Sequence, residues 1–219
     1  MVLLHGIARR ARSLKQFERA LKAAGFATLN LDYPSRKMKI DLLADHVHPA
    51  VSGFAEQNKN VHFVGHSMGG LLARAYIAKH RPVNLGRVVM LGTPNGGSEL
   101  ADRLTHFSLY QSFYGPAGLQ LTTKSNHMLE SLPEVNYAVG IVSGNLSADP
   151  FASLLSLPKP NDGRVSVQNS KLAGMVDHIT VRASHSGLLS HRGVINQTID
   201  FLQHGNFGPF DISHQHCHP

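Results

Sequence analysis

The chain contains little that could brace it covalently or hold it in a membrane. It has a single cysteine, Cys217, so no intrachain disulfide can form and the fold depends on its hydrophobic core. No apolar run approaches the roughly 20 residues that a transmembrane helix requires. The apolar start at residues 1–4 is too short for a signal peptide, and no internal repeat is visible. These absences predict a cytoplasmic protein.

The composition is that of an ordinary globular protein, with 42% hydrophobic and 16% charged residues among 219, a length that fits one domain. The formal net charge of +7 arises within residues 1–40, where nine basic side chains outnumber Glu18 and Asp32. The local surplus favours peripheral contact with anionic lipid or an anionic substrate. Nothing resembles a nucleic-acid reading helix or stacking platform, so no nucleic-acid partner is expected.

Short apolar segments alternate with longer amphipathic ones along the chain. The apolar segments predict strands at residues 2–4, 28–33, 61–64, 87–91, 137–142 and 179–182. The segments between them predict helices, the first capped by Ser13 in a capping box and the second by Asp41, with Pro49 expected to kink or split it. Strands joined by helical crossovers form a parallel sheet with helices on both faces. The sequence therefore predicts an α/β fold with about six mainly parallel strands.

A long segment interrupts this alternation after the fourth strand. Residues 94–133 exceed the length of a simple crossover, and excursions of this length are usually functional or disordered. The segment is rich in large apolar side chains, namely Phe107, Leu109, Tyr110, Phe113 and Tyr114. We expect a single domain over residues 1–219 in which this excursion forms a cap or pocket wall for an acyl group.

The sequence Gly65-His66-Ser67-Met68-Gly69 has the form G-x-S-x-G and joins a predicted strand to a predicted helix. A strained turn at this junction would lift the Ser67 hydroxyl above the edge of the sheet. Gly65 and Gly69 are expected because strand and helix cross too closely there for Cβ atoms. The positive end of the helix favours negative charge developing beside the serine. Ser67 is therefore the candidate nucleophile.

A serine nucleophile needs a histidine base and a carboxylate that orients the histidine. Where a G-x-S-x-G turn joins a strand to a helix, both residues are expected later in the chain than the serine. His185 is the best placed base, because it follows the last strand, whereas His178 precedes that strand and His191 begins the final helix. Asp162, in a turn sequence 23 residues before His185, is the favoured acid. Asp149 is the alternative, and Asp177 starts the last strand at the opposite edge of the sheet.

Two backbone N–H groups should face the oxyanion of the reaction. Met68, the residue after the nucleophile, supplies the first. Ile7, in the loop after the first strand, supplies the second. His5 in the same loop is interpreted as a structural, hydrogen-bonded imidazole.

Five segments taken together resemble the α/β-hydrolase superfamily, and within it the small bacterial lipases and esterases. These segments are His5-Gly6-Ile7, the strand-to-helix turn at residues 65–70, Leu91–Ser98, Asp162–Val165 and Ser184–Gly187. The resemblance implies a minimal version of this fold with an insertion after the fourth strand and without the N-terminal hairpin. It also implies a catalytic triad of Ser67, Asp162 and His185.

The resulting hypothesis is a serine esterase or lipase that hydrolyses small-molecule or lipid esters through an acyl-enzyme, without a cofactor or metal. Two alternatives stay open: an acyltransferase with the same triad, and a non-catalytic binding module on this fold. The histidine-rich tail at residues 214–218 could chelate a metal, but short free termini are usually disordered, and no metal site is predicted.

Overall fold

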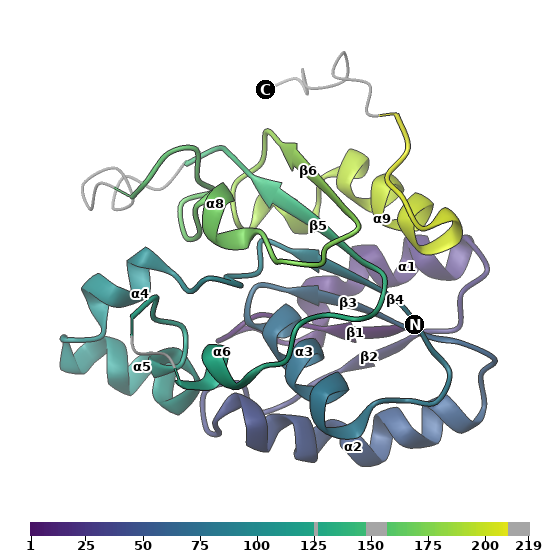
Figure 1. Cartoon of the computed structure of the whole chain (residues 1–219), viewed down its shortest axis with the longest axis horizontal. Coiled ribbons are helices and arrows are strands. Elements are labelled where there is room, and N and C mark those ends of the chain that lie inside the picture. The colour runs from purple at the N-terminus through teal and green to yellow at the C-terminus, as the bar shows by residue number, and fades with distance from the viewer. Residues whose placement is uncertain (125–126, 148–156, 210–219) are drawn as a thin grey trace.

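The computed structural model describes residues 1–124, 127–147 and 157–209 (Figure 1). Within these ranges the chain forms a sheet of six parallel strands in the order β2-β1-β3-β4-β5-β6. The strands are β1 (Val2–Leu4), β2 (Leu29–Leu31), β3 (Val61–His66), β4 (Leu85–Leu91), β5 (Val139–Gly144) and β6 (Asp177–Val181). The predicted fold class, a mainly parallel sheet of about six strands, is confirmed.

Helices follow the strands and cover both faces of the sheet, as Figure 1 shows. They are η1 (Ala11–Leu14), α1 (Lys15–Ala23), α2 (Ile40–Glu56), α3 (Met68–His80), α4 (Glu99–Leu104), α5 (Ser108–Leu119), α6 (His127–Ser131), α8 (Val167–Ser170), η2 (Gly187–Leu189) and α9 (Arg192–His204). Among the described helices, none combines the length and apolar character needed to cross a bilayer. Helices α4 and α5, from the long excursion, lie beyond the carboxyl ends of the strands.

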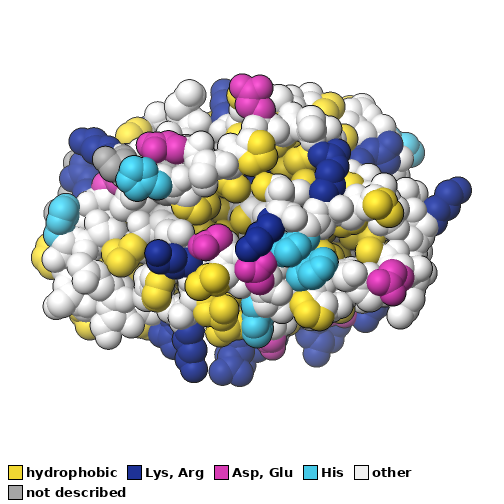
Figure 2. Space-filling view, turned by 60° about the horizontal axis from the view of Figure 1, so that its bottom comes forward, with side chains coloured by type: hydrophobic (Ala, Val, Ile, Leu, Met, Phe, Trp, Pro, Cys, Tyr) yellow, Lys and Arg dark blue, Asp and Glu magenta, His cyan; other side chains and the backbone are white. Residues whose placement is uncertain are grey.

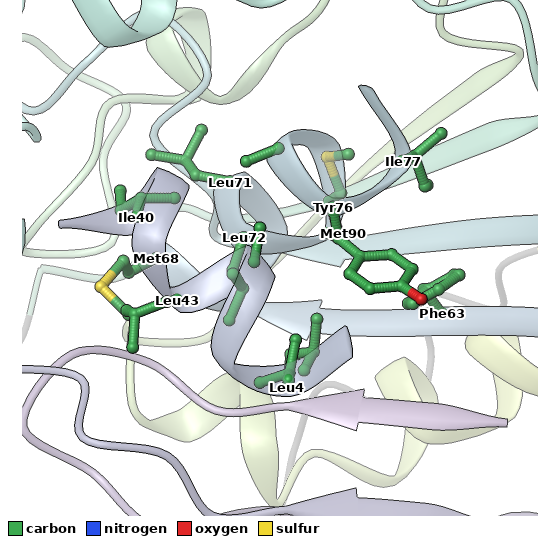
Figure 3. Packing of buried hydrophobic residues seen from close by; sticks show 14 of the residues in the cluster. Leu4, Ile40, Leu43, Phe63, Met68, Leu71, Leu72, Tyr76, Ile77 and Met90 are labelled. Carbon is green, nitrogen blue, oxygen red and sulfur yellow. The ribbon is translucent and has the colours of Figure 1, made fainter. Parts of the chain in front are cut away.

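The core consists of two layers, one on each face of the sheet. Successive strand side chains point to opposite faces, so Val2 and Leu4 pack with α2 and α3, whereas Leu3 packs with α1 and α9. Figure 3 shows the first of these layers, where Leu43 of α2 and Met68 of α3 meet. Strands β1, β3 and β5 are buried along almost their whole length, which favours apolar residues on both faces. The edge strands β2 and β6 are only partly buried and include the polar residues Asn30 and Thr180.

The starts of the first two long helices differ from the predictions. Ser13 does not cap α1; its hydroxyl donates to the Arg10 carbonyl at 2.8 Å inside the preceding 3₁₀ turn. Asp41 is the second residue of α2, and the Ile40 N–H instead donates to Oε1 of Gln120 at 2.7 Å. A distant side chain thus supplies the acceptor that local sequence was expected to provide. Helix α2 also runs through Pro49 without splitting, and Pro49 lies on the exposed side of the helix.

We expect His62 on β3 to make the stability of the fold depend on pH. Its Nδ1 accepts the Arg87 N–H at 2.9 Å, and burial together with nearby Arg87 lowers its pKa from 6.5 to about 4. The unfolded chain therefore binds a proton between pH 6.5 and 4 that the folded protein does not. We expect the free energy of unfolding to fall as the pH drops through this window, with His62 contributing at most about 3 kcal/mol before solvent screening.

Urea unfolding at pH 7 and pH 4.5, with His62→Gln beside wild type, measures this contribution. The Gln amide oxygen can still accept from Arg87 but does not titrate. The variant should therefore lose less stability than wild type on acidification, and equal losses in the two proteins would contradict the assignment.

Candidate active site

Ser67 occupies a strained turn between β3 and α3. Its backbone has φ 55° and ψ −126°, a conformation that non-glycine residues rarely adopt. Two hydrogen bonds hold it: the Ser67 N–H donates to the Leu91 carbonyl at 2.8 Å, and the Gly70 N–H donates to the Ser67 carbonyl at 3.0 Å. The serine is 8% exposed and lines a cavity at the carboxyl edge of the sheet. The elbow thus stands where the G-x-S-x-G pattern placed it.

The close crossing expected at the two motif glycines is confirmed. A Cβ atom on Gly65 would lie 2.5 Å from the Gly70 nitrogen, in the first turn of α3. A Cβ on Gly69 would lie 2.1 Å from the Leu4 carbonyl oxygen, in the neighbouring strand β1. Both distances are far below van der Waals contact, so the elbow can form only with glycine at these positions.

The structure brings Asp162 and His185 together. The His185 Nδ1–H donates to Asp162 Oδ2 at 2.7 Å, and the side chains are 13% and 1% exposed, respectively. The second carboxylate oxygen, Oδ1, accepts the Arg164 and Val165 N–H groups, each at 2.9 Å. The His185 N–H also donates to the Asp162 carbonyl at 2.9 Å. With the proton on Nδ1, the Nε2 of His185 is left as the basic nitrogen.

His66, immediately before the serine, binds the loop that carries His185. Its Nε2–H donates to the His185 carbonyl at 2.9 Å, and the two rings lie 4.8 Å apart. Burial, with His185 and Arg9 nearby, lowers the pKa of His66 well below its usual value, so the ring is neutral. The base loop is therefore fixed on both sides, by Asp162 and by His66. Sequence analysis assigned His66 no role, because the contact spans 119 residues and has no local signature.

Ile7, the predicted source of the second N–H group, lies in the turn after β1. The Arg9 N–H donates to the Gly6 carbonyl at 3.2 Å, and Ala8, with φ 56°, donates its N–H to Ser35 Oγ at 3.1 Å. Within the described residues, the Ile7 and Met68 N–H groups donate to no other group. Ile7 lines the cavity, and Met68 is the first residue of α3. Both N–H groups therefore lack a partner within the described residues, as expected of oxyanion donors, but Met68 is buried and does not itself line the cavity.

These elements enclose a cavity of about 270 Å³, slightly below the ~300–1,000 Å³ of pockets for drug-sized ligands. Tyr110, Phe113 and Tyr114 of α5 line it, whereas Phe107 and Leu109 are mostly exposed. The three lining residues share one face of the helix at i, i+3 and i+4. The excursion therefore contributes part of the cavity wall, through three of the five apolar side chains singled out in the sequence.

The other candidate histidines lie away from this cavity. His178 Nε2 contacts Ser143 Oγ at 2.8 Å near the start of β6, and His191 Nδ1 caps α9 by accepting the Val194 N–H at 3.3 Å. His5 is fully buried, donates from Nδ1 to the Gly6 carbonyl at 2.8 Å and stacks on Tyr33, in agreement with a structural role. The alternative acid Asp149 and the histidine-rich tail lie outside the described residues.

Two arginines also line the cavity: Arg9, from the basic segment for which an anionic lipid or substrate was predicted, and Arg164, to which sequence analysis gave no role. Arg9 belongs to the turn that contains Ile7, and Arg164 to the turn that contains Asp162. For Arg164, its proximity in sequence to Asp162 was the one available signal, whereas the basic surplus of residues 1–40 also pointed to Arg9. No three His, Cys, Asp or Glu residues come together as a metal site in the part of the chain that the structure describes.

Comparison with known proteins identifies a matching family and solved structures with a similar fold. The sequence profile of the α/β-hydrolase family matches residues 1–159. The mature lipase BlEst2 of Bacillus licheniformis superimposes with a TM-score of 0.70 at 20% identity, over 86% of this chain and 85% of the lipase. The metagenomic carboxyl esterase MGS0156 superimposes with a TM-score of 0.70 at 18% identity, over 84% of this chain and 63% of the esterase. The type II thioesterase BorB of the borrelidin biosynthetic cluster superimposes with a TM-score of 0.61 at 18% identity, over 92% of this chain and 90% of the thioesterase. At these identities, the structural similarity is one of fold.

Proposed function

Because the chain belongs to the α/β-hydrolase family, we propose that it is a serine hydrolase that cleaves carboxylic esters through an acyl-enzyme on Ser67. The observation that carries the proposal is the 2.7 Å hydrogen bond between His185 and Asp162, beside a cavity that Ser67 also lines. A nucleophile on an elbow and an oriented imidazole that line the same cavity are the groups that acyl transfer requires. Similar structures described as a lipase, a carboxyl esterase and a thioesterase support this chemistry.

In the first half of the reaction, the Ser67 Oγ attacks the ester carbonyl carbon while His185 Nε2 takes the hydroxyl proton. The carbonyl electron pair moves to oxygen, where the Ile7 and Met68 N–H groups stabilise the negative charge. When this pair returns, the bond to the alcohol breaks and His185 gives its proton to the departing oxygen. Asp162 keeps the ring in the required tautomer and stabilises its positive charge.

In the second half, water attacks the acyl-enzyme carbonyl and His185 Nε2 takes a proton from it. The second tetrahedral intermediate collapses, the carboxylic acid leaves and Ser67 recovers its proton. The two halves balance without an external oxidant, reductant or cofactor. A thioester would follow the same route, with a thiol leaving in place of the alcohol.

The test is hydrolysis of p-nitrophenyl butyrate, whose short acyl chain suits a cavity of about 270 Å³, combined with labelling by a fluorophosphonate. Wild type should hydrolyse the ester and be phosphonylated at Ser67, identified by peptide mass spectrometry, because the reagent reacts only with an activated serine. Ser67→Ala should lose both properties. Ser52→Ala, on α2, serves as the matched control and should retain them. A folded wild-type protein that is neither active nor labelled would refute the proposal.

A further inference from the structure

We propose that the substrate carries an anionic group, a carboxylate or a phosphate, close to its scissile ester, and that Arg9 and Arg164 bind this group. Both arginines line the cavity that Ser67 and His185 also line. The inference rests on the proposed function, because it assigns a substrate class to the same site.

Each arginine is linked to a loop that carries a candidate catalytic residue: the Arg9 side chain binds the loop of His185, and Arg164 belongs to the turn of Asp162. The Arg9 Nη2–H donates at 2.5 Å to the Oγ of Ser186, the residue that follows His185 in the chain. The Arg164 Nη1–H donates to the Tyr114 hydroxyl at 3.1 Å, on α5. The Arg164 backbone is also held, since its carbonyl accepts the Ser98 hydroxyl at 2.8 Å. The two cationic side chains are therefore positioned by the same turns that position the base and the acid.

Neither positive charge is neutralised by the protein. Within the described ranges, neither arginine forms an ion pair with a carboxylate. No Asp or Glu that the structure describes lines the cavity, and Asp162 behind it is 1% exposed with both oxygens hydrogen-bonded. A guanidinium has five N–H donors, and the contacts above use one of them in each arginine. The remaining donors are suited to bidentate binding of a carboxylate or phosphate.

Arg9 and Arg164 are the two arginines that line the cavity among the described residues, and Arg36 lies outside this lining, with its guanidinium over the Phe113 ring at 5.1 Å. On the face that Figure 2 shows, Lys and Arg side chains lie in separate groups among hydrophobic, histidine and acidic side chains. An extended polyanion would need a continuous array of cations, whereas two arginines beside a reactive serine fit one small anionic group. The occupant we infer is therefore a single anionic substituent of the ester.

The experiment compares esters that differ only in charge. p-Nitrophenyl glutarate and p-nitrophenyl valerate differ by a carboxylate in place of a methyl group, on the acyl side. Butyryl glycerol phosphate and butyryl glycerol differ by a phosphate on the alcohol side, so the two pairs distinguish the position of the anion. In wild type we expect kcat/KM for the anionic member of one pair to exceed that of its neutral partner by about tenfold or more, an advantage that falls as salt increases.

In Arg9→Gln/Arg164→Gln protein, this ratio should fall to about one. Arg10→Gln is the matched control, because Arg10 is an exposed neighbour that does not line the cavity; its ratio should stay near that of wild type. Active wild type without preference for an anionic ester in either pair, or a preference that survives in the double variant, would overturn the inference while leaving the proposed function intact.

A binding measurement separates the two proposals further. Ser67→Ala protein is titrated by calorimetry with the monoanilide of glutaric acid and with valeranilide, which mimic the two acyl groups, and with glycerol phosphate beside glycerol. Tighter binding of an anionic member, reduced by the two Arg→Gln changes, supports the arginine site even if no ester is hydrolysed. Absence of such a difference, together with absence of hydrolysis, refutes both proposals.

Discussion

Asp162→Asn protein should hydrolyse esters about 10⁴-fold more slowly than wild type while keeping its fold. The Asn oxygen can still accept the Arg164 and Val165 N–H groups that Asp162 Oδ1 accepts at 2.9 Å. Its NH₂ group would then face His185 Nδ1 in place of Oδ2 and donate to it. The His185 proton would move to Nε2, the nitrogen that has to accept the serine proton. A correctly positioned imidazole would thus be in the wrong tautomer.

The measurement is kcat for p-nitrophenyl butyrate, with circular dichroism to verify folding. Asp177→Asn supplies the matched control: this aspartate accepts the His178 and Phe207 N–H groups at the start of β6, away from the cavity, and activity should survive its replacement. Adding Asp162→Asn to Ser67→Ala should cost nothing further, because groups that act as a unit are not additive. More than a tenth of wild-type activity in Asp162→Asn would exclude the assigned role and make Asp149 the next candidate.

The second large effect is expected on stability, at Gly69. A Cβ atom there would lie 2.1 Å from the Leu4 carbonyl oxygen and 2.7 Å from that of His5, both backbone atoms of the segment at β1. Neither can swing aside as a side chain does, so β1 would have to move away from α3. We expect Gly69→Ala to lower the free energy of unfolding by about 3 kcal/mol or more and the melting temperature by roughly 10 °C.

Gly53→Ala is the comparison that isolates this steric effect. Gly53 is also helical, in α2, but a Cβ built on it meets nothing within 4 Å. Without a clash, the gain in helix propensity should raise the free energy of unfolding by about 0.5–1 kcal/mol. Thermal and urea unfolding of the two variants should therefore shift in opposite directions. A Gly69→Ala protein as stable as wild type would show that strand and helix do not meet as described.

Local patterns were sufficient to predict the architecture. The apolar runs located all six strands to within a few residues, most directly the inner strands, which are buried on both faces. The elbow followed from one motif between a strand and a helix. Helix starts were predicted less well. The acceptor at Ile40 comes from Gln120, 80 residues away, and no local pattern can indicate a partner at that distance.

In the candidate site, too, some features were predicted from local sequence and others, which depend on distant contacts, were not. Asp162 and His185, selected by their order and their place beside predicted strands, lie in direct contact, although their catalytic roles remain predictions. The bond from His66 to the His185 carbonyl and the placement of Arg164 in the cavity were not anticipated. These contacts depend on which loops meet at the carboxyl edge of the sheet. Sequence spacing determines that such loops meet, but not which of their side chains face inward.

The long separation between the elbow and the base loop bears on how the protein is made. His66 and the His185 it binds are 119 residues apart, and a ribosome adds about 5–20 residues per second, so the base is synthesised roughly 6 to 24 s after the serine. During this interval the growing polypeptide carries the proposed nucleophile without its proton acceptor. Reactivity would arise only when β6 and the loop after it dock against the completed sheet, so the nascent chain would be chemically silent towards the esters and acyl donors around it.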